Sequence, residues 1–186
     1  NGKNINDNCG AINIKKLSKT VTSKKADIGF AFDGDGDRLI AVDEKGNEID
    51  GDNLIALFAT NLIKSKKLIK NTVVTTVMSN LGFENYLKNN LEIKLIKKKV
   101  GDINVISEMK KNNYILGGEQ SGHIIFGQHM FTGDGILAAL KVVELLSVQN
   151  LKTSKLFDLY KKYPQIKVDI VITKKITKKI KFQIDK

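Results

Sequence analysis

Residues 28–43 read IGFAFDGDGDRLIAVD, and this stretch decides the local architecture. Two apolar runs, residues 28–32 and 39–43, flank the acidic segment of residues 33–38. Each run has the length and composition of a buried strand. The sequence therefore predicts a strand, an acidic loop at its carboxyl end, and a second strand that begins directly after Arg38.

Outward from this stretch, apolar spacing alternates between strand and helix periods. A short helix is predicted over residues 16–25, and EKGNEI (residues 44–49) predicts a turn into a third short strand. Further strands are expected over residues 72–77, 92–96, 114–119 and 123–126. Helices are expected from an Asp52 cap through Ile63, over residues 82–89, from an Asp102 cap through Met109, and over residues 156–160 before Pro164. A further helix is expected over residues 136–146, and its apolar composition predicts burial on several sides. Such alternation predicts an α/β fold, a mixed sheet covered by helices.

The predicted elements divide into one complete domain and two partial ones. Residues 1–51 hold too few elements for a domain and are expected to be the C-terminal part of one. Residues 52–163 are expected to form a complete α/β domain. Residues 164–186, with strand character from residue 165 onward, are expected to lead into another domain. Both ends of the chain therefore look cut.

The charge of the chain is strongly positive, with 31 Lys and Arg residues and a net charge of +11. Arg38 is nevertheless the single arginine, and aromatic residues are only 6% of the chain. Proteins that read nucleic acids rely on arginine for bidentate contacts. We therefore interpret the lysines as solvated surface with a secondary role in steering anionic substrates, and we expect no nucleic-acid partner. A lone arginine indicates a position that needs a planar guanidinium.

Cellular context is constrained by two further features. Cys9 is the single cysteine, so an intrachain disulfide is impossible, which suits a reducing cytoplasm. No apolar run approaches the ~20 residues of a membrane span. We expect a cytoplasmic protein without a membrane partner.

The acidic segment is the first candidate site. Asp33, Asp35 and Asp37 alternate with Gly34 and Gly36, which permit the turn that would bring three carboxylates together. Oxygen ligands of this kind suit a hard divalent cation, and Mg²⁺ commonly completes its shell with water or phosphate oxygens. Arg38 would then be placed to bind a phosphate bidentately. The segment predicts one Mg²⁺ per active site.

The acidic segment also fits two other interpretations. The EF-hand pattern is matched by Asp33, Asp35, Asp37 and Glu44, but Arg38 stands where the calcium loop requires glycine, and the flanks predict strands. A plain polar turn between strands is the second alternative. A turn rarely needs three acidic groups, so metal binding ranks above both.

The second candidate site is GGEQSGH, residues 117–123, between two predicted strands. Glu119 and Ser121 alternate, so in extended geometry both could face the hydroxyls of one sugar. Gly118 would let the backbone approach the ligand, and His123 could act as an acid or base. A hairpin loop with solvated polar residues explains this stretch equally well.

We expect structural roles for TGDG and His129. TGDG, residues 132–135, is expected to open the buried helix, with Thr132 or Asp134 as its cap. His129 has no constellation of reactive residues around it in the sequence.

Taken together, FDGDGDR and the later GEQSGH resemble the α-D-phosphohexomutase family, and AFDGDGDRLIAVDEKGNEIDGD is most similar to its bacterial amino-sugar branch. NGKNINDNCGA and TGDGILAAL fit this branch too. The resemblance runs along nearly the whole chain. It implies part of a second domain, a third domain, and the link into a fourth, from a fold of four α/β domains around a cleft.

The resemblance also implies roles for single residues. The motif aspartates, here Asp33, Asp35 and Asp37, would hold Mg²⁺ beside a phosphoserine. The motif arginine, here Arg38, would bind the transferred phosphate and count among the catalytic residues.

In the second motif, the resemblance implies that Glu119 and Ser121, with Gly118, contact the sugar. It places His123 near the reacting hydroxyls as a catalytic residue. Two departures stand out: the family's phosphoserine loop with its Ser-His-Asn core is absent, and Ile103 stands where the branch usually has arginine.

The implied function is the magnesium-dependent interconversion of glucosamine 6-phosphate and glucosamine 1-phosphate through a phosphoserine and a bisphosphorylated intermediate. The expected partners are the phosphosugar, the remaining domains of the parent chain, and a second copy in a homodimer. Without the phosphoserine, this chain alone is expected to be inactive. Alternatives are phosphomannomutase or phosphoglucomutase activity, a non-catalytic divalent-cation module, and a lysine-driven nucleic-acid binder.

Overall fold

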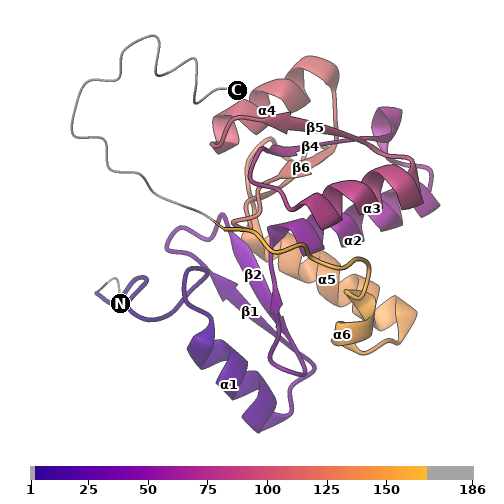
Figure 1. Cartoon of the computed structure of the whole chain (residues 1–186). Helices are drawn as coiled ribbons and strands as arrows, with labels where there is room; N and C mark the ends of the chain where they lie inside the picture. Colours follow the sequence, from indigo (N-terminus) through magenta and orange to yellow (C-terminus); the bar gives the residue numbers. More distant parts are fainter. Residues whose placement is uncertain (1–2, 167–186) are drawn as a thin grey trace.

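The structure is a computed structural model that describes residues 3–166. Two units are visible in Figure 1, a small sheet with α1 and a larger sheet with helices on both faces. The strand expected from residue 165 onward lies almost entirely outside the described residues. No helix in the part of the chain that is described has the length and apolar character needed to cross a membrane.

The smaller unit is built on the opening stretch. It contains α1 (Lys15–Lys24), β1 (Ile28–Phe32), β2 (Leu39–Asp43) and β3 (Glu48–Ile49), in the antiparallel sheet order β1-β2-β3. Phe32 pairs with Leu39, so residues 33–38 form the connection of the β1–β2 hairpin. The predicted strand–loop–strand arrangement is therefore present.

The larger unit carries a four-stranded mixed sheet in the order β5-β4-β6-β7. β5 and β6 run parallel to β4, and β7 is antiparallel to β6. The strands are β4 (Thr72–Thr76), β5 (Lys94–Lys98), β6 (Leu116–Gly118) and β7 (Ile124–Phe126), and the helices are α2 (Gly51–Lys64), η1 (Ile69–Asn71), α3 (Leu81–Leu91), α4 (Asp102–Asn112), α5 (Gly135–Gln149) and α6 (Thr153–Leu156). The predicted α/β fold class is confirmed.

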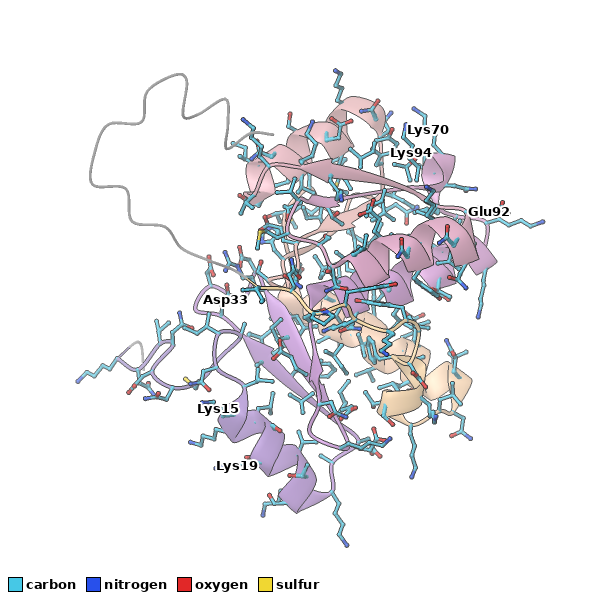
Figure 2. All side chains as sticks on the ribbon, in the orientation of Figure 1. Lys15, Lys19, Asp33, Lys70, Glu92 and Lys94 are labelled. Atoms are coloured by element: carbon cyan, nitrogen blue, oxygen red, sulfur yellow. The ribbon has the colours of Figure 1, made fainter. Side chains whose placement is uncertain are left out.

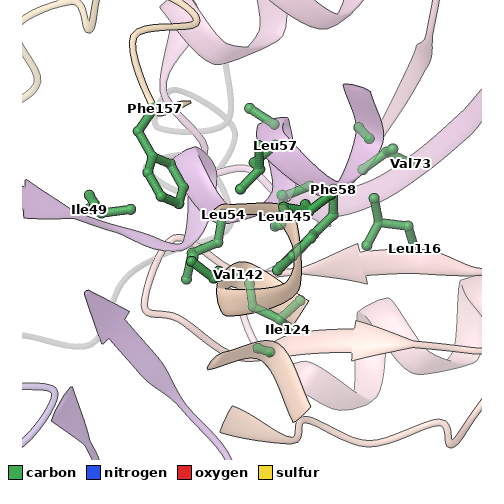
Figure 3. Close-up of a cluster of buried hydrophobic side chains, with 14 of the residues drawn as sticks. Ile49, Leu54, Leu57, Phe58, Val73, Leu116, Ile124, Val142, Leu145 and Phe157 are labelled. Atoms are coloured by element: carbon green, nitrogen blue, oxygen red, sulfur yellow. The ribbon is translucent and has the colours of Figure 1, made fainter. Parts of the chain in front are cut away.

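Helices cover both faces of this sheet. α4 lies on one face, where Val105 and Met109 pack against Val74 of β4. α2, α3 and α5 lie on the other face, around a larger buried cluster (Figure 3). Leu54, Phe58, Val73, Leu116, Ile124 and Val142 belong to this cluster, which extends to Leu39 and Ile49 of the smaller sheet. Each such side chain stabilises the fold by about 1.5–3 kcal/mol through burial, and the shared cluster holds the two units against each other.

α5 departs from the prediction in its exposure. Ala138 and Val142 are buried as expected, but Ile136 and Leu140 are about 60% exposed (61% and 62%). The reason is that α5 has neighbours on one side only within the described residues.

The predicted starts of two helices were wrong. The N-cap of α2 is Asp50, whose side chain accepts the backbone N–H of Asn53, and Asp52 lies inside the first turn. α4 begins at Asp102 itself, with Gly101 at the cap position. In both cases the chain turns one or two residues earlier than the sequence pattern suggested.

The remaining boundary errors concern β5 and α6. β5 starts at Lys94, because Glu92 ends α3 in a left-handed conformation with φ of 53°. The last helix, expected over residues 156–160, is only the short α6, and a turn at residues 157–159 follows it.

Candidate metal and sugar-binding site

The acidic loop is a compact turn at the end of β1. Gly36 adopts φ of +75°, which favours glycine, and its N–H donates to the carbonyl of Asp33 at 3.3 Å. The Asp33 carboxylate accepts the Arg38 backbone N–H at 3.1 Å, which closes the loop. Figure 2 places Asp33 on the side of the smaller unit that faces the larger one.

This turn brings three carboxylates together. Asp33, Asp35 and Asp37 each offer an oxygen, and these atoms all lie within 4.8 Å of one another. Burial and contacts with Asp33 raise the pKa of Asp37, the charge of Asp35 adds to this, and nearby His123 opposes it. Burial and the crowding of like charges therefore both disfavour the ionised form of Asp37.

Arg38 offsets part of this crowding. Its Nε lies 3.5 Å from Asp33 Oδ2 and 3.8 Å from Asp37 Oδ1. One guanidinium cannot neutralise three carboxylates. An all-oxygen donor set of this kind fits a divalent cation such as Mg²⁺, whose ligands lie within roughly 4.2 Å of one another when each is at about 2.1 Å.

Glu44, the last ligand required by the EF-hand interpretation, is engaged elsewhere. Its carboxylate accepts the backbone N–H of Ser154 at 2.9 Å and the Ser154 hydroxyl at 2.5 Å. These two bonds hold the end of β2 against α6. The flanks of the loop are strands, so neither part of the EF-hand arrangement is present in the described chain.

The second motif forms a tight turn between β6 and β7. The N–H of Gly122 donates to the Glu119 carbonyl at 3.0 Å, with Gln120 and Ser121 at the corner. The expectation that Glu119 and Ser121 alternate along an extended strand was wrong, because the chain reverses between them. Glu119 is buried and Ser121 exposed, yet both line one cleft.

Two glycines of this turn are required by their surroundings. A Cβ on Gly118, at φ of +155°, would lie 2.3 Å from the carbonyl oxygen of His123, and one on Gly122, at φ of +95°, would lie 2.3 Å from that of Leu39. Side chains at either position would separate the strands that meet here. Glu119 is also fixed, because its Oε1 accepts the backbone N–H of Gly101 at 2.9 Å.

The two motifs are joined directly by backbone. The N–H of Leu39, next to the acidic loop, donates to the carbonyl of Gly122 at 3.0 Å. Arg38 and His123 form an antiparallel bridge. The N–H of Gly51 donates to the Gln120 carbonyl at 3.0 Å. The acidic loop (residues 33–38) and the turn of the second motif (residues 119–122, named the sugar-motif turn) therefore form one continuous structure.

A cleft of about 590 Å³ lies along this junction. Its size is in the range of small-molecule sites. Its lining includes Arg38 from the first motif and Glu119 and Ser121 from the second. It also includes Glu48 and Asp50, which the sequence did not single out.

Asp50 and Gly101 could have been suspected from the sequence. Asp50 begins a second Asp-Gly-Asp triplet, and Gly101 directly precedes a predicted helix. Glu48 gave no signal, because a single glutamate in a short strand is common. Ile103 is 72% exposed in the first turn of α4 and does not line the cleft.

His123 is buried next to the acidic loop. It is only 2% exposed and is not among the residues that line the cleft. Its Nδ1 lies 3.1 Å from Asp37 Oδ2. The structure thus brings His123 to a carboxylate of the acidic loop, and its predicted catalytic role stays a prediction.

Comparison with known families agrees with this arrangement. Residues 50–163 match the family model of phosphoglucomutase/phosphomannomutase α/β/α domain III, and residues 6–46 match that of domain II. The chain belongs to the phosphoglucomutase/phosphomannomutase family.

Among curated relatives, the phosphoglucosamine mutase of Bacillus velezensis is 50% identical over 175 residues, which is 94% of this chain and 39% of the relative. That of Caldanaerobacter subterraneus is 49% identical over 178 residues, 96% of this chain and 40% of the relative. The chain thus spans about two fifths of the length of these proteins.

Among solved structures, a family protein from Burkholderia thailandensis superposes with a TM-score of 0.71 at 25% identity, covering 80% of this chain and 32% of that one. An Aspergillus fumigatus N-acetylphosphoglucosamine mutase, solved with GlcNAc-6P and magnesium, gives a TM-score of 0.66 at 21% identity, covering 84% of this chain and 40% of that one. The latter supports the fold alone.

Proposed function

We propose that this chain is the metal- and sugar-binding part of a magnesium-dependent phosphoglucosamine mutase. The parent protein would interconvert glucosamine 6-phosphate and glucosamine 1-phosphate through a phosphoserine and a bisphosphorylated intermediate. The single observation that carries the proposal is the backbone junction between the acidic loop and the sugar-motif turn, with Arg38 between them at the cleft.

The acidic loop is assigned to the cation. Asp33, Asp35 and Asp37 would hold one Mg²⁺, and the all-oxygen donor set supports this choice. When bound, the ion would neutralise negative charge on the phosphoryl group in transfer. Arg38, which is 42% exposed and lines the cleft, would contact the same phosphoryl oxygens through its guanidinium.

The sugar-motif turn is assigned to the sugar hydroxyls. Oε1 of Glu119 is used by the Gly101 N–H, which leaves Oε2 to accept from the sugar. Ser121 offers a hydroxyl at the exposed corner of the turn, and Gly118 lets the β6 backbone pass close to β7. These groups would orient the ring while Arg38 orients the phosphate.

An amino sugar is favoured over a neutral hexose by the charge of the cleft. The lining carries three carboxylates, on Glu48, Asp50 and Glu119, against Arg38 as its one cation among the described residues. Asp50 is neutralised by Lys162 at 2.7 Å, which leaves Glu48 and Glu119 to attract a protonated amine. Glucosamine phosphate therefore ranks above mannose and glucose phosphates as the proposed substrate.

The active site would be completed by the phosphoserine and fourth domains of the parent protein. The protein would act in the cytoplasm, in line with its single cysteine.

A chimaera tests the function. Residues 3–166 would replace the matching segment of the Bacillus velezensis phosphoglucosamine mutase, and isomerisation of glucosamine, glucose and mannose phosphates would be compared with and without Mg²⁺. We expect Mg²⁺-dependent turnover with kcat/KM for glucosamine phosphate at least about tenfold above the other sugars, the order expected for one charge contact. A folded chimaera without activity, or with a preference for mannose phosphate, would contradict the proposal.

A further inference from the structure

His123 lies in a closed position behind the acidic loop. Its side chain is 3% exposed, against 31% for Asp37, and the two side chains approach to 3.1 Å between Nδ1 and Oδ2. The other ring nitrogen, Nε2, is buried and has no hydrogen-bond partner among the described residues. The imidazole of His123 therefore contacts Asp37 directly from a buried position.

The turn before α5 seals this position. A Cβ on Gly133 would lie 2.5 Å from His123 Cε1 and 2.6 Å from the Asp37 carbonyl oxygen. Only glycine therefore lets residues 132–135 pack this closely against the imidazole. The TGDG segment does more than open a helix, because it also forms the back wall of the histidine position.

The same turn supports the acidic loop directly. The N–H of Gly135 donates to the Gly36 carbonyl at 3.0 Å, and a Cβ on Gly135 would lie 2.6 Å from the Arg38 carbonyl oxygen. Asp134 fixes the turn in place by accepting the Leu137 N–H at 2.8 Å. The acidic loop of the smaller unit is thus held by a rigid segment of the larger one.

We propose that His123 is a positioning residue for the metal site: its Nδ1–H donates to Asp37 Oδ2 and holds the carboxylate for the cation. Asp37 Oδ1 has no hydrogen-bond partner in the described chain and remains the oxygen for the ion. Outer hydrogen bonds of this kind orient ligating carboxylates, and their loss typically costs 10–100-fold in metal affinity. The inference rests on the proposed cation site.

The same arrangement connects the sugar to the metal. His123 follows the turn of Glu119 and Ser121 by two residues and bridges to Arg38 in the backbone. A shift of the sugar-motif turn would move the imidazole and, with it, Asp37. His123 is therefore a side-chain link between the second motif and the acidic loop.

The test compares Mg²⁺ affinity, measured by titration calorimetry, in the 186-residue chain and its variants. His123→Leu removes the donor, and we expect it to weaken binding about 10–100-fold. His123→Asn offers an amide N–H in place of Nδ1–H, and we expect affinity within about threefold of the unmodified chain. His129→Asn is the matched control, because His129 lies outside the acidic cluster, and no change is expected.

A second measurement locates the imidazole proton in the unmodified chain, so it does not depend on whether the His123 variants fold. ¹⁵N–¹H NMR of the unmodified chain should show the His123 proton on Nδ1, and Asp37→Asn should shift that resonance. A proton on Nε2 with a bare Nδ1 would overturn the inference. So would unchanged Mg²⁺ affinity in His123→Leu, or a loss in His123→Asn as large as in His123→Leu, while the cation site itself would stand. Absence of Mg²⁺ binding to the unmodified chain would overturn the cation site and the inference with it.

Discussion

Asp-Gly-Asp triplets occur in two segments of this chain, and the two segments have opposite fates. The first, residues 33–37, holds two overlapping triplets in the hairpin loop, where the three carboxylates converge within 4.8 Å. The second, residues 50–52, starts α2: Asp50 caps the helix, and Asp52 is fully buried and accepts the Asn80 N–H at 2.7 Å. The same letters thus make a cluster of three carboxylates in one place and a helix start in the other.

The difference lies in what surrounds each triplet. The hairpin loop leaves Asp35 exposed and Asp37 Oδ1 without a hydrogen-bond partner among the described residues. A helix N-terminus supplies backbone N–H donors that use these oxygens. Asp50 has a further partner in Lys162 at 2.7 Å. We conclude that motif letters indicate chemistry only where the local structure leaves the side chains free.

The largest expected effect is on turnover, which should respond differently to substitutions in the two Asp-Gly-Asp segments. In the chimaera, Asp35→Asn should lower turnover with every sugar by about 10²–10³-fold, the usual loss when one electrostatic contact to the transition state is removed. Asp52→Asn, the matched change in the other triplet, should alter turnover only to the extent that it alters the folded fraction. Steady-state kinetics at saturating Mg²⁺ measure both. Equal losses in the two variants would show that the triplets do not differ in function.

The next effect concerns stability and pH. Burial raises the pKa of Asp52 to about 7, although the Asn80 N–H opposes this shift. A raised acid pKa means that the folded state holds its proton more tightly, so this group's contribution to stability falls as pH rises from about 4 to about 7. Three pKa units correspond to at most about 4 kcal/mol.

Asp52→Asn removes this titration. We expect the variant to be more stable than the unmodified chain at pH 8, by about 2 kcal/mol once relaxation of the site is allowed for, and the difference to shrink toward pH 4. Urea unfolding at several pH values measures the difference. A gap that is constant with pH, or largest at pH 4, would contradict the assignment.

A third comparison uses the glycine inside each triplet region. A Cβ on Gly51 would lie 2.0 Å from the Glu119 carbonyl oxygen, whereas one on Gly36 meets nothing within 4 Å. Gly51→Ala should therefore destabilise the chain by about 3 kcal/mol through overpacking. Gly36→Ala should cost only about 1 kcal/mol, for its left-handed φ. Thermal unfolding of the two variants measures both losses of stability. A loss in Gly51→Ala no larger than that in Gly36→Ala would show that Gly51 is not in close contact with the turn.

The smallest effect comes from the ion pair of the second triplet. Lys162 Nζ lies 2.7 Å from Asp50 Oδ2, and the lysine side chain is 38% exposed. Solvent screening limits such a pair to less than about 1 kcal/mol. Lys162→Met should lower the free energy of unfolding by that amount or less, and the loss should disappear in 1 M salt. A loss of several kcal/mol would indicate a buried charge.

The sequence predicted the α/β class and most elements, because apolar periodicity reports burial directly. The strands at residues 28–32 and 39–43 match the prediction residue by residue. Helix starts were less predictable, since Asp50 and Asp52 are chemically equal as caps and only the tertiary position of Asn80 separates them. Length also misled at residues 156–160, where an amphipathic pattern continues beyond a four-residue helix.

The site divides in the same way. The convergence of the three aspartates followed from glycine spacing, which is local information. The tight turn between the strands at residues 114–119 and 123–126 was likewise predicted from local sequence. The burial of His123 and its contact with Asp37 depend on segments far apart in the chain. The Gly133 and Gly135 contacts behind the loop are tertiary as well, so TGDG looked like a helix start and nothing more.

The central claim is that the acidic loop binds one divalent cation, and Mn²⁺ binding followed by electron paramagnetic resonance tests it most directly. Mn²⁺ would be titrated into the 186-residue chain, Asp35→Asn and Asp52→Asn, with Mg²⁺ and Ca²⁺ as competitors. We predict one Mn²⁺ per chain, displaced by Mg²⁺, with affinity at least about tenfold weaker in Asp35→Asn and unchanged in Asp52→Asn. Equal affinity in all three proteins, or no bound Mn²⁺ in the unmodified chain, would contradict the account.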